Sequence, residues 1–207
     1  DELQQEMIAL NCLNGTAQTL AGAIADEFSL EVAWFREGPG PLPQLGTDPS
    51  NPLLAAEMKA NMAAGDCLLG FAWDGDCDRF VCFDDEGNLV PTYYLVGLIA
   101  EYFLHLHPGS AIVFDTKLCW NTLDVIRRYG GLPVAARTGH TFMKSKMRES
   151  GAVYGGELSA HHYFGDFLGC DSGMLAWLTV LKLLKTAEAP IKELVAERRA
   201  EICCTPE

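Results

Sequence analysis

The chain has 207 residues, of which 49% are hydrophobic and 10% aromatic, so it has enough apolar material for one large domain or two of about 100 residues. Its 15 basic and 28 acidic residues give a net charge of −13, which argues against nucleic acid and anionic membrane as partners. No apolar run reaches the roughly 18 residues of a membrane span, and no signal-peptide pattern opens the sequence.

Along the first 91 residues, short apolar runs alternate with segments of helical period. The pattern predicts strands at 6–12, 31–35 and 67–73 and helices at 16–28 and 53–64. The last strand runs into "DGDCDR", and Glu86-Gly87-Asn88 after it predicts a hairpin turn. Residues 1–91 are therefore expected to form a first α/β domain with the acidic loop at 74–79.

The same alternation resumes after residue 91. Helices are predicted at 93–106, 121–129, 141–150 and 172–186, with strands at 110–115, 132–137 and 152–156. A second domain at 92–189 follows, and then a C-terminal helix within 190–207. The expected fold class is α/β, with two successive domains that have mixed, largely parallel sheets.

The eight cysteines show no CxxC pair and no repeated spacing. Most stand in apolar surroundings, which is typical of reduced, buried thiols, so we expect a cytoplasmic protein. The sequence therefore predicts neither a disulfide framework nor a zinc site.

Asp74, Asp76 and Asp78 alternate with small residues directly after an apolar strand. Ligands bind at the carboxyl edge of parallel sheets, and three carboxylates there would offer the hard oxygen ligands that Mg²⁺ prefers. We expect Gly75 to permit the turn and Arg79 to hold a ligand phosphate beside the cation.

A loop of this composition has two other interpretations. A calcium-binding EF-hand is excluded, because its sixth position is Arg79 and its twelfth is Asp85. A solvated Asp-Gly turn with local side-chain hydrogen bonds remains the alternative from composition alone.

A second group of polar residues follows the strands of the second domain. His140 stands at a predicted helix start, where free amides favour an anion. Glu157, beside Ser159, could accept hydrogen bonds from a vicinal diol. His161 and His162 are expected to titrate near pH 7.

Each of these residues also has an ordinary structural explanation. His140 could cap a helix, Glu157 could pair within the fold, and the other histidines could pack beside Tyr163. Lys144 and Lys146 are typical of a solvated helix face. Lys117 follows strand 110–115 directly, which favours a ligand-binding role at the carboxyl edge.

"GFAWDGDCDR", "TGH" and "GGELSAHHYF", in this order, resemble the α-D-phosphohexomutases, specifically their bacterial phosphomannomutase branch. "WNTLDVIRRYGGLPV" and "CDSGM" extend the similarity to nearly all of residues 6–200. The resemblance implies that the chain corresponds to the second and third domains of such an enzyme, an intramolecular phosphotransferase of the isomerase class.

The resemblance also implies roles for individual residues. Asp74, Asp76 and Asp78 match the Mg²⁺-binding loop, and Arg79 matches the arginine beside the active-site phosphoserine. Within the sugar-binding loop at 155–161, Glu157 and Ser159 match the residues that bind the hydroxyls on C3 and C4. The remaining matches are the substrate-binding Thr138 and Gly139, His140 and His161 near the reacting oxygen, and the ligand-side Lys117.

Such enzymes move a phosphoryl group between a phosphoserine and the 1- or 6-oxygen of a hexose, through a hexose 1,6-bisphosphate. The implied partners are therefore mannose or glucose 1- and 6-phosphates. A Ser-His-Asn-Pro type loop and an Arg-x-Ser-Gly-Thr phosphate clamp are absent from the chain. We therefore expect domains I and IV to be missing, residues 190–207 to begin the connection to the fourth, and the chain alone to be inactive.

Other functions stay open at this point. The chain could belong to a phosphoglucomutase or a dual-specificity enzyme, because mannose and glucose share the C3 and C4 hydroxyls and differ at C2. It could also be a non-catalytic sugar-phosphate-binding protein, or half of a split enzyme whose other domains come from a separate polypeptide.

Overall fold

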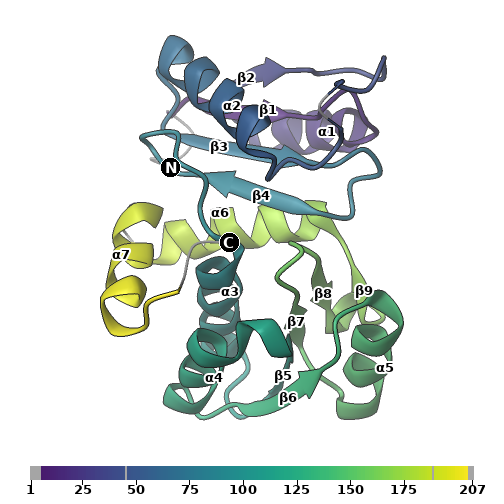
Figure 1. The fold of residues 1–207 in the computed structure, drawn as a ribbon, viewed down its shortest axis with the longest axis vertical. Coiled ribbons are helices and arrows are strands. Elements are labelled where there is room, and N and C mark those ends of the chain that lie inside the picture. The colour runs from purple at the N-terminus through teal and green to yellow at the C-terminus, as the bar shows by residue number, and fades with distance from the viewer. Residues whose placement is uncertain (1–5, 45, 188, 205–207) are drawn as a thin grey trace. The chain divides into compact units, whose positions relative to one another are not determined.

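The computed structural model describes residues 6–44, 46–187 and 189–204, which form two units that divide between Val90 and Pro91. Each unit combines a mixed sheet with helices, so the predicted α/β fold class is confirmed (Figure 1). The units are described separately below.

The first unit runs β1 (Ile8–Asn11), α1 (Ala17–Phe28), β2 (Val32–Phe35), α2 (Pro52–Gly65), β3 (Leu69–Trp73) and β4 (Phe80–Phe83). Its strands lie in the order β2-β1-β3-β4. Strand β1 pairs in parallel with both β2 and β3, whereas β4 runs antiparallel to β3. The acidic loop joins β3 to β4 and begins where β3 ends.

Helix α2 packs on β1 and β3 through one apolar stripe. Leu54, Met58 and Met62 recur every four residues and are buried. A Cβ at Gly70 would lie only 2.4 Å from the sulfur of Met62, so the glycine lets the helix approach β3 closely. The side chain of Asn51 caps the helix by accepting a 2.9 Å hydrogen bond from the Leu53 N–H.

The hairpin turn expected at 86–88 is present. The Asp84 N–H donates a 3.0 Å hydrogen bond to the Asn88 carbonyl, and Gly87 adopts a φ of +70°. Glycine accepts this left-handed conformation without steric cost.

The second unit contains α3 (Thr92–Leu106), β5 (Ala111–Asp115), the 3₁₀ turn η2 (Thr116–Leu118), α4 (Cys119–Arg128), β6 (Leu132–Ala136), α5 (His140–Ser150), β7 (Tyr154–Gly156), β8 (His162–Phe164), η3 (Gly165–Phe167), β9 (Cys170–Asp171), α6 (Gly173–Ala187) and α7 (Ile191–Glu201). The strand order is β6-β5-β7-β8-β9. Strands β6, β5 and β7 are parallel, and β8 and β9 extend the sheet in antiparallel pairing.

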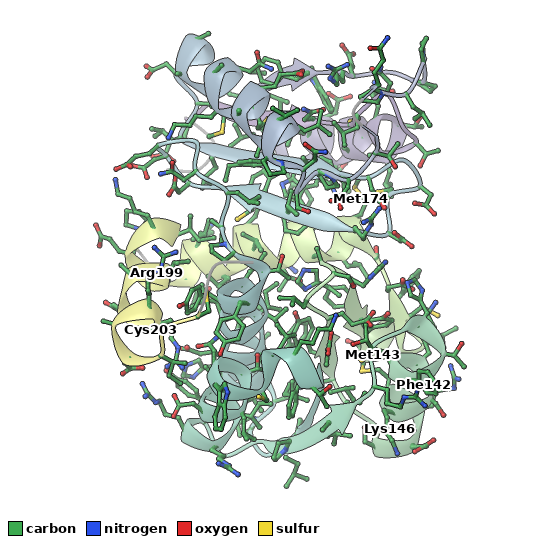
Figure 2. All side chains as sticks on the ribbon, viewed as in Figure 1. Phe142, Met143, Lys146, Met174, Arg199 and Cys203 are labelled. Carbon is green, nitrogen blue, oxygen red and sulfur yellow. The ribbon has the colours of Figure 1, made fainter. Side chains whose placement is uncertain are left out.

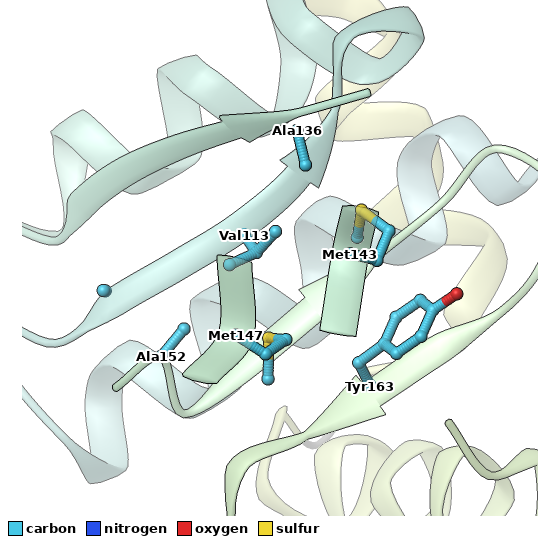
Figure 3. Close-up of a cluster of buried hydrophobic side chains, with 7 residues drawn as sticks. Val113, Ala136, Met143, Met147, Ala152 and Tyr163 are labelled. Atoms are coloured by element: carbon cyan, nitrogen blue, oxygen red, sulfur yellow. The ribbon is translucent and has the colours of Figure 1, made fainter. Parts of the chain in front are cut away.

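Helix α5 covers one face of this sheet, and α3 and α4 pack on the other (Figure 1). Under α5, Met143 and Met147 pack against Val113 of β5, Ala136 of β6 and Tyr163 of β8 (Figure 3). Met143 is buried while its neighbour Phe142 is 42% exposed, as expected for adjacent positions on an amphipathic helix (Figure 2). The buried stripe fixes the start of α5, and hence His140, at the edge of the sheet.

The short elements β8, β9, η2 and η3 were not predicted. Three- and two-residue strands carry too few residues to show a period of two. Only the pairing of β8 with β7 and of β9 with β8 reveals them. The strand expected at 152–156 begins at Tyr154.

All eight cysteines are free thiols, as predicted, but they are not all buried. Cys12, Cys67 and Cys82 are buried, Cys203 is exposed near the end of the chain, and the other four lie between (Figure 2). Among the described helices, none combines the length and apolar character that crossing a membrane requires.

Candidate functional site

The acidic loop after β3 brings its three aspartates together. One carboxylate oxygen from each of Asp74, Asp76 and Asp78 lies within 4.8 Å of the other two. Asp74 is buried, Asp76 is exposed and Asp78 lies between. Carboxylate oxygens are hard ligands of the kind that Mg²⁺ prefers, so the three aspartates together could hold a metal ion.

Arg79 supports this loop from within. Its Nε lies 2.7 Å from Oδ2 of Asp74, and its main-chain N–H donates a 3.1 Å hydrogen bond to Oδ1 of the same carboxylate. A longer ion pair of 3.6 Å joins the guanidinium to Asp48. Both Asp74 oxygens therefore already accept one hydrogen bond, although a carboxylate oxygen has a second lone pair for a cation.

The turn itself differs from the prediction. Cys77, and not Gly75, takes the left-handed conformation, with a φ of +68°. Gly75 instead lies close to the segment before α1, where its carbonyl accepts a 3.1 Å hydrogen bond from the Thr16 N–H. A Cβ on Gly15 would lie 2.6 Å from that carbonyl, so Gly15 is the residue whose small size matters here.

In the second unit, Glu157 lies directly after β7 and is buried, with 1% of its surface exposed. Its Oε1 accepts a 2.6 Å hydrogen bond from the Gly139 N–H, and its Oε2 accepts a 2.5 Å hydrogen bond from the Tyr163 hydroxyl. The carboxylate therefore links the loop after β7 to the loop after β6. Sequence reasoning placed Tyr163 only as a packing neighbour.

His161 and Ser159 lie against this carboxylate. The His161 Nδ1 is 3.6 Å from Oε2 of Glu157 and 2.8 Å from the Ser159 hydroxyl oxygen. The His161 ring also meets the His140 ring edge to face, with centroids 4.3 Å apart. Four of the residues that the sequence singled out thus lie in one cluster.

His140 begins α5 and faces a carboxylate that the sequence analysis did not identify. Its Nδ1 lies 3.1 Å from Oδ2 of Asp171, on β9. Lys144 pairs with the other oxygen of Asp171 at 2.8 Å, and the Asp171 side chain is only 7% exposed. The interpretation of Lys144 as part of a solvated helix face was therefore wrong. Lys146, by contrast, pairs with Glu149 at the surface.

Lys117 and Thr138 lie on the loops after β5 and β6. Lys117 is exposed on η2, and its ammonium makes no ion pair with any residue in the described ranges. The exposed Lys117 ammonium is therefore available to an anionic ligand. The Thr138 hydroxyl, by contrast, donates a 3.0 Å hydrogen bond to Asp115, the last residue of β5.

The expectation that His162 titrates near pH 7 was wrong. The residue is fully buried on β8, and its Nδ1 lies 2.7 Å from the Tyr154 hydroxyl. Burial, with a smaller contribution from His161, lowers the pKa of His162 from 6.5 to about 3. His162 is therefore a neutral, structural imidazole, because its full burial disfavours the charged form.

Comparison with known families matches both units. Residues 91–202 match the model of phosphoglucomutase/phosphomannomutase, alpha/beta/alpha domain III, and residues 2–87 match domain II of the same family.

The sequence is also similar to curated proteins that are named as hexose phosphate mutases. The chain is 40% identical to a phosphomannomutase of Escherichia coli K12 over 199 residues, which cover 93% of the chain and 44% of that protein. It is 39% identical to phosphohexose mutases of Xanthomonas campestris over 204 residues, 97% of the chain and 45% of that protein. The chain thus spans less than half the length of these relatives.

Among solved structures, a phosphoglucomutase/phosphomannomutase family protein from Burkholderia thailandensis superposes with a TM-score of 0.79 at 30% sequence identity. The match covers 86% of this chain and 40% of that one. The arrangement of elements described above is therefore shared with that protein.

Proposed function

Because the chain belongs to the phosphoglucomutase/phosphomannomutase family, we propose that it carries the metal loop and sugar loop of a phosphomannomutase. The proposed reaction interconverts mannose 6-phosphate and mannose 1-phosphate by Mg²⁺-dependent phosphoryl transfer, through a phosphoserine outside these 207 residues. A cytoplasmic location is part of the proposal, and the eight free thiols support it.

The observation that carries the proposal is the coexistence of two polar constellations, each at the carboxyl edge of its own sheet. Asp74, Asp76 and Asp78 converge after β3. Glu157, with His161 beside it, is bonded to the loop that precedes α5. A fold that needed neither metal nor sugar would have no use for both groups.

Asp74, Asp76 and Asp78 would hold the Mg²⁺ ion, which supplies neutralising charge for the phosphoryl oxygens when it is bound. Arg79 and the exposed Lys117 would contribute positive charge of the chain's own to phosphate oxygens. Phosphoryl transfer requires positioning and charge neutralisation more than covalent chemistry from the protein, and these residue types suit that requirement.

His161 is the proposed proton carrier. The Glu157 carboxylate, 3.6 Å from Nδ1, favours a proton on that nitrogen. The Nε2 atom is then the acceptor that could take a proton from a sugar hydroxyl as it attacks the phosphoryl group. Ser159, in the same loop as His161, would bind a neighbouring hydroxyl of the sugar.

Glucose phosphates are the second candidate substrates. The matching family model covers phosphoglucomutases as well as phosphomannomutases. Glu157 and Ser159 are proposed to bind the hydroxyls on C3 and C4, which both sugars share. A non-catalytic sugar-phosphate-binding protein would keep the same contacts without turnover.

An amide NMR titration of this chain tests the proposal, with Mg²⁺ added first and mannose 1-phosphate second. We expect Mg²⁺ to shift resonances of residues 73–80, and the sugar phosphate to shift those of 138–141 and 155–162. Asp76→Asn should abolish the metal shifts, because Asp76 is an exposed ligand whose loss does not disturb the core. Asp166→Asn, an exposed aspartate in the other unit, is the control.

If the spectrum is well dispersed but neither loop shows a shift on titration, the proposal for this chain is contradicted. Shifts with glucose 1-phosphate of equal size and affinity would instead favour the dual-specificity alternative. Tight sugar-phosphate binding without Mg²⁺ would favour the binding protein.

A further inference from the structure

Three parallel strands of the second unit end beside one another, and each is followed by residues of the proposed site. Strand β5 lies between β6 and β7. Lys117 follows β5, Thr138 and Gly139 follow β6, and Glu157 follows β7. Neither sequence reasoning nor the proposed function assigns a role to Asp115, the last residue of the central strand.

The Asp115 carboxylate accepts hydrogen bonds from all three of these loops. Its Oδ1 accepts from the Lys117 main-chain N–H at 2.8 Å and from the Thr138 hydroxyl at 3.0 Å. Its Oδ2 accepts a longer bond of 3.4 Å from the Leu158 main-chain N–H. The central position of β5 is what makes one side chain reach both flanking loops.

Asp115 has no exposed surface, and no cation pairs with it in the described part of the chain. A buried carboxylate is costly unless hydrogen bonds compensate it, and an apolar side chain could fill the same volume without that cost. The three donors satisfy the carboxylate, but they come from loops and not from the sheet. Its bonds therefore serve to hold those loops.

We propose that Asp115 is a positioning residue, which sets the placement of the Thr138-Gly139 loop relative to the Leu158-Ser159 loop. The proposal rests on the proposed function, because those loops carry the expected sugar contacts. The hydrogen bonds of Asp115 go to groups of the three loops, so it acts through these neighbours. The Gly139–Glu157 hydrogen bond joins the same two loops a second time, so the pair is linked at two points.

Asp115→Asn tests this, first without any ligand. The asparagine oxygen can still accept from the Lys117 N–H and the Thr138 hydroxyl, whereas its amide group would face the Leu158 N–H, donor against donor. We expect the amide of Leu158 to shift and to exchange its hydrogen about tenfold faster, with the unit still folded.

Thr138→Val is the second variant, and it removes one bond while leaving Asp115 in place. If the carboxylate couples the loops, this change after β6 should shift the Leu158 amide after β7. Thr116→Val, at an exposed threonine beside Asp115, is the matched control and should leave Leu158 unchanged. A merely structural role would lower stability without moving this resonance selectively.

Titration with mannose 1-phosphate then separates the two proposals. If the wild-type chain binds, both Asp115→Asn and Thr138→Val should raise the Kd about tenfold while the Mg²⁺-induced shifts at 74–79 stay unchanged. If the wild-type chain does not bind, the proposed function fails and the ligand-free measurements alone decide on Asp115. An unmoved Leu158 amide in folded Asp115→Asn and Thr138→Val overturns the inference.

Discussion

The main-chain N–H of Gly139 donates a 2.6 Å hydrogen bond to Oε1 of Glu157, a residue 18 positions further along the chain. Gly139 is the N-cap of α5, so the bond places a negative charge at the positive end of that helix. The same carboxylate accepts the hydroxyl of Tyr163. One buried side chain thereby orders the start of α5 and the loop after β7.

Replacing Glu157 by Gln should lower the free energy of unfolding by about 1–2 kcal/mol. Gln preserves the shape but replaces charge-assisted hydrogen bonds with neutral ones, which are roughly half as strong. Chemical denaturation measures the change. Glu149→Gln is the control, because Glu149 is exposed and pairs only with its own helix, and it should cost less stability than Glu157→Gln. Equal losses in the two variants would contradict the role of Glu157.

Arg79→Met should lower stability by about 2 kcal/mol, since it leaves the buried carboxylate of Asp74 without its cation. Mg²⁺ should then stabilise the variant more than the wild type, because the ion gains an oxygen that Arg79 had engaged. Thermal unfolding with and without Mg²⁺ measures both effects. Arg36→Met removes a half-exposed pair with Glu57 in the same unit, so it should show a smaller loss and the same Mg²⁺ stabilisation as the wild type. Equal Mg²⁺ stabilisation of wild type and Arg79→Met would refute the argument.

The sequence predicts the alternation of strands and helices well, because apolar periodicity persists over the length of each long element. It also points to Asp74, Asp76 and Asp78, since their spacing of two is a local property. The sequence does not predict the pairing of His140 with Asp171. Asp171 lies on a two-residue strand, β9, whose position depends on pairing with β8 and has no local signature.

The backbone conformation of the acidic loop is a second feature that the sequence does not predict. Glycine is the default residue for a left-handed turn, and the sequence therefore favours Gly75 as the residue that permits the turn in "DGDCDR". The structure places the positive φ at Cys77, two residues later, because the chain must return to pair as β4 while the Gly75 carbonyl bonds to Thr16. Only the contact with a distant segment decides between the two positions.

Cys77→Gly should be more stable than Cys77→Ala by about 1 kcal/mol. A left-handed conformation costs a residue with a Cβ roughly 1–2 kcal/mol, part of which glycine loses again through its greater freedom when unfolded. The same pair of substitutions at Cys119, which has a helical φ of −57°, should show the opposite order. Denaturant titration of the four variants measures the two differences. If Cys77→Ala were at least as stable as Cys77→Gly, backbone strain at Cys77 would be negligible.

His162 should make the stability of the second unit depend on pH. Its pKa is lowered by burial to about 3 in the folded state, from a usual 6.5, so the unfolded chain binds the extra proton between these values. Its contribution is therefore fully present above about pH 6.5 and is lost as the pH falls toward 3. Between pH 7 and pH 5 the loss should be about 2 kcal/mol.

His162→Asn removes the titration but keeps an acceptor for the Tyr154 hydroxyl, so this variant should lose less stability than the wild type over the same range. The difference between the two proteins matters, because the carboxylates titrate in both. His105→Asn, at an exposed histidine, should follow the wild-type curve. If the difference between wild type and His162→Asn stays constant from pH 7 to pH 5, then His162 accepts its proton without unfolding, and its side chain is open to water in the native state.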